Sequence, residues 1–345
     1  MSGILQPPLG SWLDEAAEDL DQGRGDPAAV LPRLADAGLL APEAPADAIE
    51  TIAAVCERSL ACGFVLWSHR AYTELVRMSP NVGLRDRQLP ELAAGRRAGA
   101  PCLSNAMKHL ARLEPPAVRA VAENGRVRLS GTLPWATNLR PQGFEVAIPA
   151  ASEHGRILVV SLPSGQPGLT RSPDLELTAL RCTNTAAIHL QEAQVGEDRI
   201  LHPDAADWLG GRVRSAFLSL QCAMALGVAR RSLAEAAAHA GRGLGRGALS
   251  AGVDRSRDRL DALEGALKAG ASQDVFVDRP RALFEIRIEL ADLAAEAVRL
   301  ELMALGAQAF LRDGPGRGFA RRAREAAFLP IVTPSVTQLQ TALAA

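Results

Sequence analysis

Apolar positions in the first hundred residues recur at helical spacing. The stretch DPAAVLPRLADAGLL (26–40) follows this spacing and stops at Gly38, and residues 47–78 continue it over a longer, more apolar pair of helices. A repeat of three to four residues is typical of helices with one face in a core, and glycine commonly follows a helix end. The pattern predicts an N-terminal helical bundle, to which we assign residues 1–97.

A different pattern begins near residue 98, where short alternating runs are broken by Gly, Pro and Asn. In AVRAVAENGRVRLSG (117–131), Asn124 and Gly125 separate two such runs. This pair is typical of the type I′ turn of a β-hairpin, in which both central residues have positive φ. Further runs predict strands at 144–150, 156–163 and 185–195. We expect a small antiparallel β-barrel or sandwich domain over residues 98–205.

Helical spacing returns in the last third of the chain, in longer segments rich in Ala and Leu. These segments lie at 214–240, 256–269 and 280–311, followed by a shorter tail. Such helices bury wide apolar faces against antiparallel neighbours or against another subunit. The sequence predicts a C-terminal four-helix bundle over residues 206–345 and, for the whole chain, an α+β fold.

Composition narrows the class of protein. The 345 residues are 48% hydrophobic and 22% charged, with a formal net charge of −1. This hydrophobic content supports a large core and is unlike that of a disordered chain. A near-neutral charge argues against binding to nucleic acid, which usually requires a basic surface.

The cysteines and the apolar runs bear on the cellular compartment. The five cysteines are odd in number and lack CxxC spacing, so we expect reduced core residues and neither disulfides nor a metal site. The N-terminus lacks the basic and apolar regions of a signal peptide, and no run of about 20 apolar residues occurs. These features predict a cytoplasmic protein that does not enter the membrane.

One aromatic residue occupies an unusual position. Only 4% of the residues are aromatic, yet RLSGTLPWATN (128–138) places Trp135 between a proline and an Ala-Thr-Asn run. The indole either closes a β-hairpin as a core anchor or contacts a ligand. The segment alone leaves both interpretations open.

Several segments, in order, resemble the acyl-CoA dehydrogenase superfamily of flavoproteins. LSGTLPWATN resembles its G-K-W-I-T-N segment, and LTALRCTNTAAIHLQEAQVGEDRIL resembles its G-x-R-x-S/T-x-T and F-x-D-V-x-V-P segment. ADAGLL and ALGVARRSLAEAAAHA resemble two of its helices. The resemblance covers nearly the whole chain and supports the same α, β, α order.

The resemblance implies a flavin, FAD or alternatively FMN. It places the indole of Trp135 against the flavin ring and Thr137 near the reactive N5 edge, where a hydroxyl or N–H group stabilises the reduced ring. It also implies contacts to the flavin from three residues of APCLSNAMKHL, namely Leu103, Ser104 and Asn105. Family members form homodimers and homotetramers, so we expect one of these.

The phosphate-binding string of the family, R-x-x-F-G, is replaced here by AGRGLGRGALS (240–250). Glycine N–H groups can approach a phosphate, and Arg242 or Arg246 can pair with it. An interhelical loop without a ligand is the competing interpretation.

The catalytic glutamate of the family is missing. Depending on the alignment, its C-terminal position falls on Thr333 and its neighbours or on Pro330, and its alternative position falls on Phe217 and Leu218. None of these is a carboxylate. Glu325 is the nearest acidic residue in the tail, and we expect it to form a salt bridge with the arginines around it.

Three functions remain open. The first is oxidation of an acyl-CoA-like small molecule at the flavin N5, as in the dehydrogenases. The second is a reduced-flavin-dependent monooxygenase or hydroxylase using a C4a-peroxyflavin, in which His69 faces the flavin with Ser104 or Asn105 as its companion. The third is a degenerate flavin-binding or assembly protein without catalysis.

Overall fold

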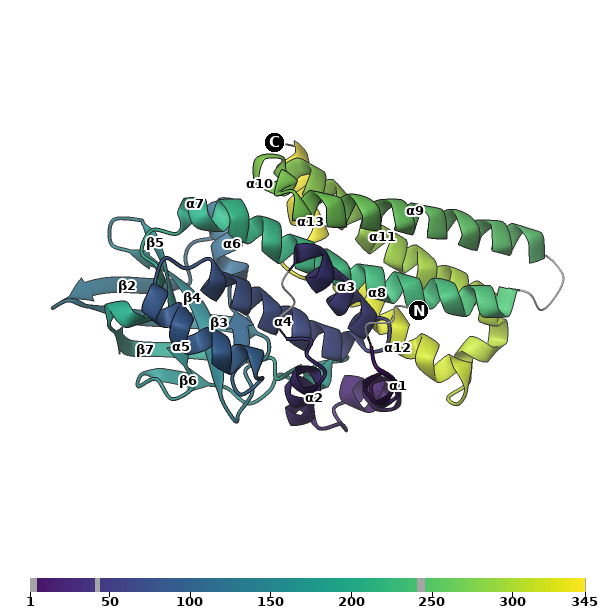
Figure 1. Ribbon diagram of the computed structural model, residues 1–345, viewed down its shortest axis with the longest axis horizontal. Coiled ribbons are helices and arrows are strands. Elements are labelled where there is room, and N and C mark those ends of the chain that lie inside the picture. Colours follow the sequence, from purple (N-terminus) through teal and green to yellow (C-terminus); the bar gives the residue numbers. More distant parts are fainter. Residues whose placement is uncertain (1–4, 41–43, 241–245, 345) are drawn as a thin grey trace.

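Helices form both ends of the chain and strands its middle part, as the hydrophobic pattern predicts. The computed structural model describes residues 5–40, 44–240 and 246–344, and the sheet and the longest helices lie at opposite ends of the molecule (Figure 1). The helices before the first strand are α1 (Pro7–Gln22), α2 (Val30–Asp36), α3 (Pro45–Cys56), α4 (Leu60–Arg77) and α5 (Val82–Ala93). Helix α2 ends just before Gly38, whose φ of +73° confirms the predicted stop.

The described strands form one eight-stranded sheet. The strands are β1 (Ala98–Pro101), β2 (Val118–Glu123), β3 (Arg126–Ala136), β4 (Phe144–Ser152), β5 (Ile157–Pro163), β6 (Leu169–Arg171), β7 (Ala186–Val195) and β8 (Ile200–His202). Their order is β6-β7-β3-β2-β4-β5-β8, and β1 pairs with β4 off this path. A short helix, α6 (Ser104–Leu110), lies between β1 and β2.

The predicted hairpin is confirmed, but the sheet is not wholly antiparallel. Asn124 and Gly125 have φ values of +51° and +73° and join β2 to β3. Five pairings are antiparallel, whereas β1 and β2 both run parallel to β4. The four-residue strand β1 was not predicted, because AGAP has no alternation of apolar and polar residues.

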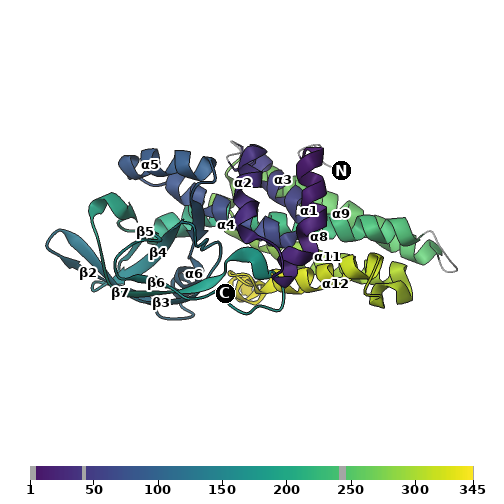
Figure 2. The same cartoon turned by 90° about the horizontal axis from the view of Figure 1, so that it is seen from below.

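Long helices follow the sheet. They are α7 (Ala206–Trp208), α8 (Arg214–Ala240), α9 (Arg246–Ser272), α10 (Val275–Asp278), α11 (Pro280–Leu305), α12 (Pro315–Phe328) and α13 (Val336–Ala344). A π-turn over Leu209–Val213 leads into α8. Helices α8, α9 and α11 lie side by side in both views and extend away from the sheet (Figures 1 and 2).

Helix α8 crosses α3 at very short range. A Cβ atom at Gly227 would lie 2.3 Å from the carbonyl oxygen of Ala53 and 2.5 Å from Cβ of Cys56. Only glycine permits this approach between two helix backbones. The N-terminal helices and α8 therefore share one core, and the five cysteines are all buried in it without disulfides, as expected.

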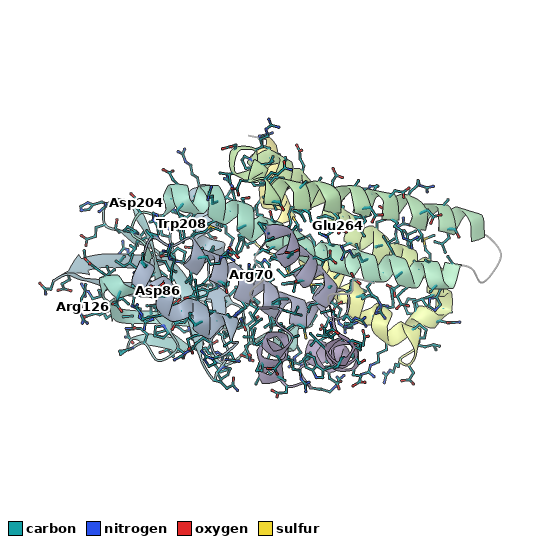
Figure 3. All side chains as sticks on the ribbon, viewed as in Figure 1. Arg70, Asp86, Arg126, Asp204, Trp208 and Glu264 are labelled. Carbon is teal, nitrogen blue, oxygen red and sulfur yellow. The ribbon has the colours of Figure 1, made fainter. Side chains whose placement is uncertain are left out.

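A cluster of charges joins α3, α8 and α9 beside this crossing. Arg230 bonds to Glu50 at 2.9 Å and to Glu264 at 2.6 Å, and Lys268 also contacts both carboxylates. Glu264 marks the α9 side of the cluster in Figure 3. Burial alone would raise the pKa of Glu50, but the hydrogen bonds from Arg230 and Lys268 lower it to about 2. The cluster therefore remains ionised at neutral pH.

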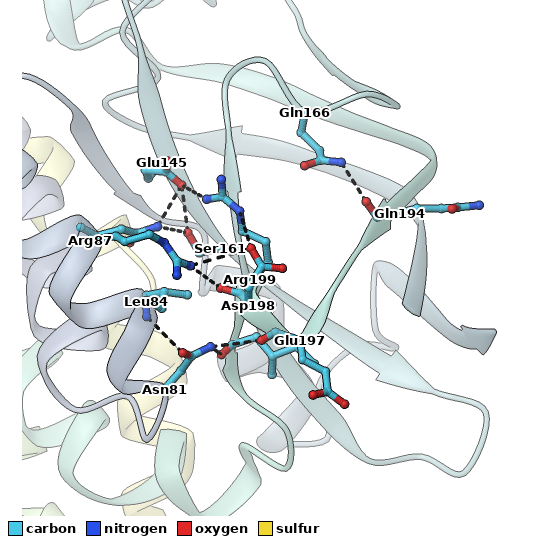
Figure 4. A network of polar contacts seen from close by, with 12 residues as sticks. Asn81, Leu84, Arg87, Glu145, Ser161, Gln166, Gln194, Glu197, Asp198 and Arg199 are labelled. Carbon is cyan, nitrogen blue, oxygen red and sulfur yellow. Dashed lines mark hydrogen bonds and ion pairs between the residues drawn. The ribbon is translucent and has the colours of Figure 1, made fainter. Parts of the chain in front are cut away.

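A second polar network fastens α5 to the sheet (Figure 4). Gln88 donates to Ser161 at 2.8 Å and to Glu145 at 3.1 Å, and Ser161 also donates to Glu145 at 3.0 Å. Arg199 approaches the same carboxylate at 3.4 Å. Burial raises the pKa of Glu145, and the Arg199 charge opposes that rise. The network sets the distance between the helical layer and β4 and β5.

None of the helices in the described ranges is long and apolar enough to cross a membrane.

Candidate functional site

Trp135 projects from the end of β3 into solvent. Its exposed fraction is 59%, which is unusual for so large an apolar side chain. The pairing of β3 with β7 is irregular between Leu133 and Ala136, so Pro134 and Trp135 lie outside the regular ladder. The interpretation of Trp135 as a hairpin core anchor is therefore wrong. An indole held on the surface by the backbone is available to stack on a planar ligand.

Thr137 begins a chain of hydroxyl groups that runs into the protein. Its Oγ1 lies 3.0 Å from that of Thr185, which lies 2.8 Å from that of Thr183. Thr183 donates its proton to the carbonyl of Leu180 at 2.8 Å. Since each hydroxyl has one proton, Thr185 donates to Thr183 and Thr137 donates to Thr185. The Thr137 hydroxyl is left with acceptor capacity only, whereas the sequence-based expectation allowed it to donate.

Hydrogen bonds fasten the segment that follows β3 to helix α4 and to β1. Ser68 donates to the carbonyl of Thr137 at 3.2 Å and approaches that of Gly99 at 3.4 Å. Asn138, with a φ of +67°, donates its side-chain amide to the same Gly99 carbonyl at 2.9 Å. The backbone at Thr137 is thus fixed on both sides, which orients the exposed indole two residues earlier.

His69, on the same helix, links three elements. Its Nδ1 accepts from the N–H of Gly99 at 3.1 Å, so Nε2 carries the proton and donates to the carbonyl of Leu92 at 3.1 Å. The side chain is fully buried, and this burial lowers its pKa to about 4. Both ring nitrogens are occupied by backbone groups. A role for His69 at a flavin stays a prediction, and it requires one of these hydrogen bonds to open.

The three residues expected to contact the flavin pyrimidine have different surroundings. Leu103 is fully buried, and Ser104 is the first residue of α6. Asn105 donates to Glu114 at 2.8 Å and to the carbonyl of Pro115 at 3.0 Å, and it accepts from the N–H of Ala117 at 2.7 Å. These bonds use the Asn105 amide to close the loop after α6. Contact of the three residues with a ligand stays a prediction.

The expected phosphate-binding arginines are not placed. Arg242 lies outside the described residues, and Arg246 is the first residue of α9, with its side chain outside the described part. Their pairing with a phosphate also stays a prediction.

The positions of the missing glutamate hold no group that can take a proton from carbon. Thr333 offers its carbonyl to the Nε2 of Gln221 at 3.1 Å, while Phe217 and Leu218 are buried in α8. Glu325 is buried, accepts from the N–H of Leu60 at 3.1 Å and pairs with Arg321 at 3.7 Å. The predicted salt bridge is therefore present. Burial raises the pKa of Glu325, and the Arg321 charge opposes the rise.

A buried arginine lies behind Gln221. The Nε of Arg287 donates to the Oε1 of Gln221 at 2.9 Å, and its Nη2 donates to the carbonyl of Leu329. Its Nη1 has no hydrogen-bond partner in the described part of the chain. The sequence gives no signal for this pairing, because Arg287 lies in a regular amphipathic helix. Its charge gives the Gln221–Thr333 contact a positive electrostatic environment.

An aromatic row lies on the α8 side of α4. Trp67 stacks on Phe64 with ring centroids 5.3 Å apart and meets Phe217 edge-on at 5.1 Å. Phe64 in turn meets Phe328 of α12 edge-on at 5.0 Å. The buried indole N–H of Trp67 has no acceptor among the described residues. The spacing of Phe64 and Trp67, three residues apart on a helix, is the signal that could have identified this row.

No protein-family model matches the chain, and no curated protein matches it in sequence. Solved structures match it in fold over nearly its whole length. The glutaryl-coenzyme A dehydrogenase complex with glutaryl-CoA has a TM-score of 0.82 at 15% identity and covers 100% of this chain and 96% of its own.

Two further structures have comparable similarity. Dibenzothiophene monooxygenase (TdsC) from Paenibacillus sp. A11-2 has a TM-score of 0.77 at 17% identity, covering 97% of this chain and 93% of its own. KijD3 in complex with FMN and a dTDP-amino-keto-sugar has a TM-score of 0.79 at 17% identity, covering 97% and 90%. The chain has the acyl-CoA dehydrogenase fold.

Proposed function

We propose that the protein is a flavin-dependent oxidoreductase. The observation that carries this proposal is Trp135, which is 59% exposed on a segment whose backbone is fastened from both sides. Burying so large an apolar surface under a planar ring stabilises a complex, whereas leaving it in water does not. A bound flavin would supply a two-electron acceptor and, once reduced, reactivity toward oxygen.

The side chains at Trp135 and Thr137 fit a flavin. Trp135 would cover one face of the ring, and Thr137, with its proton committed to Thr185, would accept from an N–H group at the ring edge. FAD is our proposal because of the family resemblance, although KijD3 was solved with FMN. Arg242 and Arg246 remain our candidates for the phosphate.

The absence of a carboxylate at Thr333, Phe217 and Leu218 bears on the type of reaction. Abstraction of a proton next to a carbonyl requires a positioned base, and Glu325 is already committed to Leu60 and Arg321. Oxygen transfer from a reduced flavin needs no such base. We therefore favour the monooxygenase function, as in the matched dibenzothiophene monooxygenase, over dehydrogenation of an acyl-CoA as in glutaryl-CoA dehydrogenase.

The first experiment measures flavin binding by absorbance and by the change in flavin fluorescence. We expect Trp135→Ala to weaken binding at least about tenfold, because loss of an aromatic wall removes roughly 2 kcal/mol of burial. Phe310→Ala is the matched control, since Phe310 is 84% exposed but belongs to the turn after α11. Equal binding by both variants, or no binding by the wild type, would contradict the proposal.

The second experiment separates the two reactions. Under anaerobic conditions, the oxidised holoprotein is mixed with glutaryl-CoA and butyryl-CoA, and we expect the flavin absorbance to remain. The reduced holoprotein is then mixed with labelled oxygen and either dibenzothiophene or indole, and we expect label in the product. Bleaching by either acyl-CoA would establish dehydrogenation instead.

The remaining expectations concern the substrate, the oligomeric state and the cellular compartment. We propose that the protein acts on a small molecule, with a CoA thioester as the alternative to a heterocyclic substrate. We also propose a cytoplasmic homodimer or homotetramer, which size-exclusion chromatography with light scattering would test.

A further inference from the structure

A cleft of about 220 Å³ lies on the side of α4 away from Trp135 and Thr137. Helices α3, α4, α8 and α9 contribute its walls, and Arg70, labelled in Figure 3, lies on its α4 side. Ser68 and Tyr72 of α4 contact the sheet, whereas Arg70, Glu74 and Arg77 line the cleft. The cleft is therefore separate from the proposed flavin surface.

The floor of the cleft is apolar. It is formed by Pro45, Ala48, Ile49, Ala216, Leu220 and Ala271. An apolar surface of this size suits a short hydrocarbon body.

Charged side chains from α4 and from the residues around the start of α8 and α10 also line the cleft. Arg70 pairs with Glu74 at 2.8 Å, and Arg212 pairs with Asp274 at 3.4 Å. Arg77 meets Glu74 only at 3.8 Å, which is longer than a hydrogen bond. Among the described residues, three arginines and two carboxylates line the cleft.

Arg77 is the group best placed to bind an anion. Its side chain is 42% exposed, and in the described chain it makes the Glu74 contact but no hydrogen bond. A guanidinium with free N–H groups binds a carboxylate through two parallel hydrogen bonds.

A buried hydroxyl supplies an independent observation. Ser219 of α8 lines the cleft and is 3% exposed, yet its Oγ has no hydrogen-bond partner among the described residues. Buried hydroxyl groups are almost always satisfied, and a serine in a helix commonly donates to a carbonyl one turn earlier. A ligand oxygen in the cleft would satisfy Ser219.

We infer that this cleft binds a small organic monocarboxylate, with its apolar body on the α3 and α8 floor and its carboxylate at Arg77 and Ser219. A carboxylate accepts hydrogen bonds from both a guanidinium and a hydroxyl. The assignment does not depend on the flavin, because none of the residues involved contacts Trp135 or Thr137 in the described structure.

The test is isothermal titration calorimetry of the purified full chain with sodium hexanoate. 1-Hexanol and hexylamine have the same chain with a neutral or positive head, and acetate has the head without the chain. We expect hexanoate to bind at least about tenfold more tightly than any of the three. Equal binding of hexanol, or no binding of hexanoate, would overturn the inference.

Two variants locate the bound carboxylate. Arg77→Gln should weaken hexanoate binding about tenfold, and Ser219→Ala should weaken it about threefold. Arg257→Gln is the matched control, since Arg257 is similarly exposed and pairs with Asp254 at 3.7 Å on α9, outside the cleft. Unchanged affinity in both cleft variants, or an equal loss in Arg257→Gln, would place hexanoate elsewhere and refute the site.

Ser219→Ala also tests the hydroxyl directly. If Ser219 is unsatisfied without ligand, the variant has an unchanged or higher resistance to urea than the wild type while binding hexanoate less well. A clear loss of stability without ligand would show that Ser219 already has a structural partner, and the assignment of its hydroxyl to the ligand would then fail.

Discussion

On the side of α4 that meets the sheet, every polar group described above has a partner: Ser68 bonds to Thr137, His69 to Gly99 and Leu92, and Tyr72 to Gln88. On the side that meets α3 and α8, Arg77 makes no hydrogen bond and Ser219 of α8 has no partner within the described residues. The satisfied side fixes the position of the proposed flavin segment. We infer that the second side keeps its polar groups for a ligand. Substitutions on the first side should therefore lower the free energy of unfolding, whereas substitutions on the second side should weaken ligand binding with little effect on stability.

The largest effect on stability is expected at His69. His69→Ala removes two buried hydrogen bonds and leaves the N–H of Gly99 without its partner, while the carbonyl of Leu92 keeps the N–H of Gly95. We expect the free energy of unfolding to fall by about 3 kcal/mol, measured by urea denaturation. His239→Ala is the control, because His239 is half-buried and bonds within its own helix. A loss at His69 no larger than at His239 would break the contrast between the two sides of α4.

The lowered pKa of the same histidine predicts that the free energy of unfolding depends on pH. The pKa of His69 is lowered from 6.5 to about 4 by burial, so its contribution is complete above pH 6.5 and is lost as the pH falls toward 4. Between pH 7 and pH 5 this loss amounts to roughly 2 kcal/mol of unfolding free energy. Glu145 and Glu325, whose pKa values are raised, change stability in the opposite direction. The difference between wild type and His69→Ala isolates the histidine, and equal pH slopes would contradict its burial as a neutral ring.

A smaller loss is expected at Tyr72. Its hydroxyl donates to Gln88 at 2.6 Å and lies 2.7 Å from Ser161. Tyr72→Phe should cost about 1 to 2 kcal/mol in urea denaturation, since it leaves two buried polar groups with one partner fewer. Ser219→Ala provides the matched removal of a hydroxyl on the other side of α4, where we expect no loss. Similar losses for both variants would contradict the comparison.

The smallest effect is expected at Arg77. Its 3.8 Å contact with Glu74 is partly exposed, so Arg77→Gln should change the free energy of unfolding by no more than about 0.5 kcal/mol. Thermal and urea denaturation without ligand would measure this change. A loss of several kcal/mol would mean that Arg77 supports the fold instead of being available to a ligand.

Patterns within short segments predicted much of the fold. The Asn124–Gly125 turn, the stop at Gly38 and the long apolar faces after residue 212 each depend on neighbouring residues and are all present. The strand β1 was missed because its pairing with β4, over 40 residues away, is invisible in AGAP itself.

The candidate site was predicted in part. Trp135 was singled out because aromatic residues are rare in this chain, and the family resemblance assigned it to the flavin. Its exposure excludes the core anchor, and its contact with a flavin stays a prediction. The hydrogen bonds of His69 and Asn105 to backbone groups could not be predicted. Their partners are too far away in the sequence for a pattern within a short segment to reveal them. Two atoms without a hydrogen-bond partner in the described part of the chain, the Oγ of Ser219 and the Nη1 of Arg287, are likewise visible only once the helices are packed.

The hydrogen bond from Leu60 to Glu325 has a consequence for synthesis of the chain. The first turn of α4 receives this side-chain acceptor from a residue 265 positions later. On the ribosome, α4 and the segment it fastens have left the exit tunnel long before Glu325 has been added. The N–H of Leu60 therefore has no acceptor from Glu325 until α12 has been synthesised and packs against α4. A chain truncated before residue 325 should leave this region accessible to proteases and chaperones.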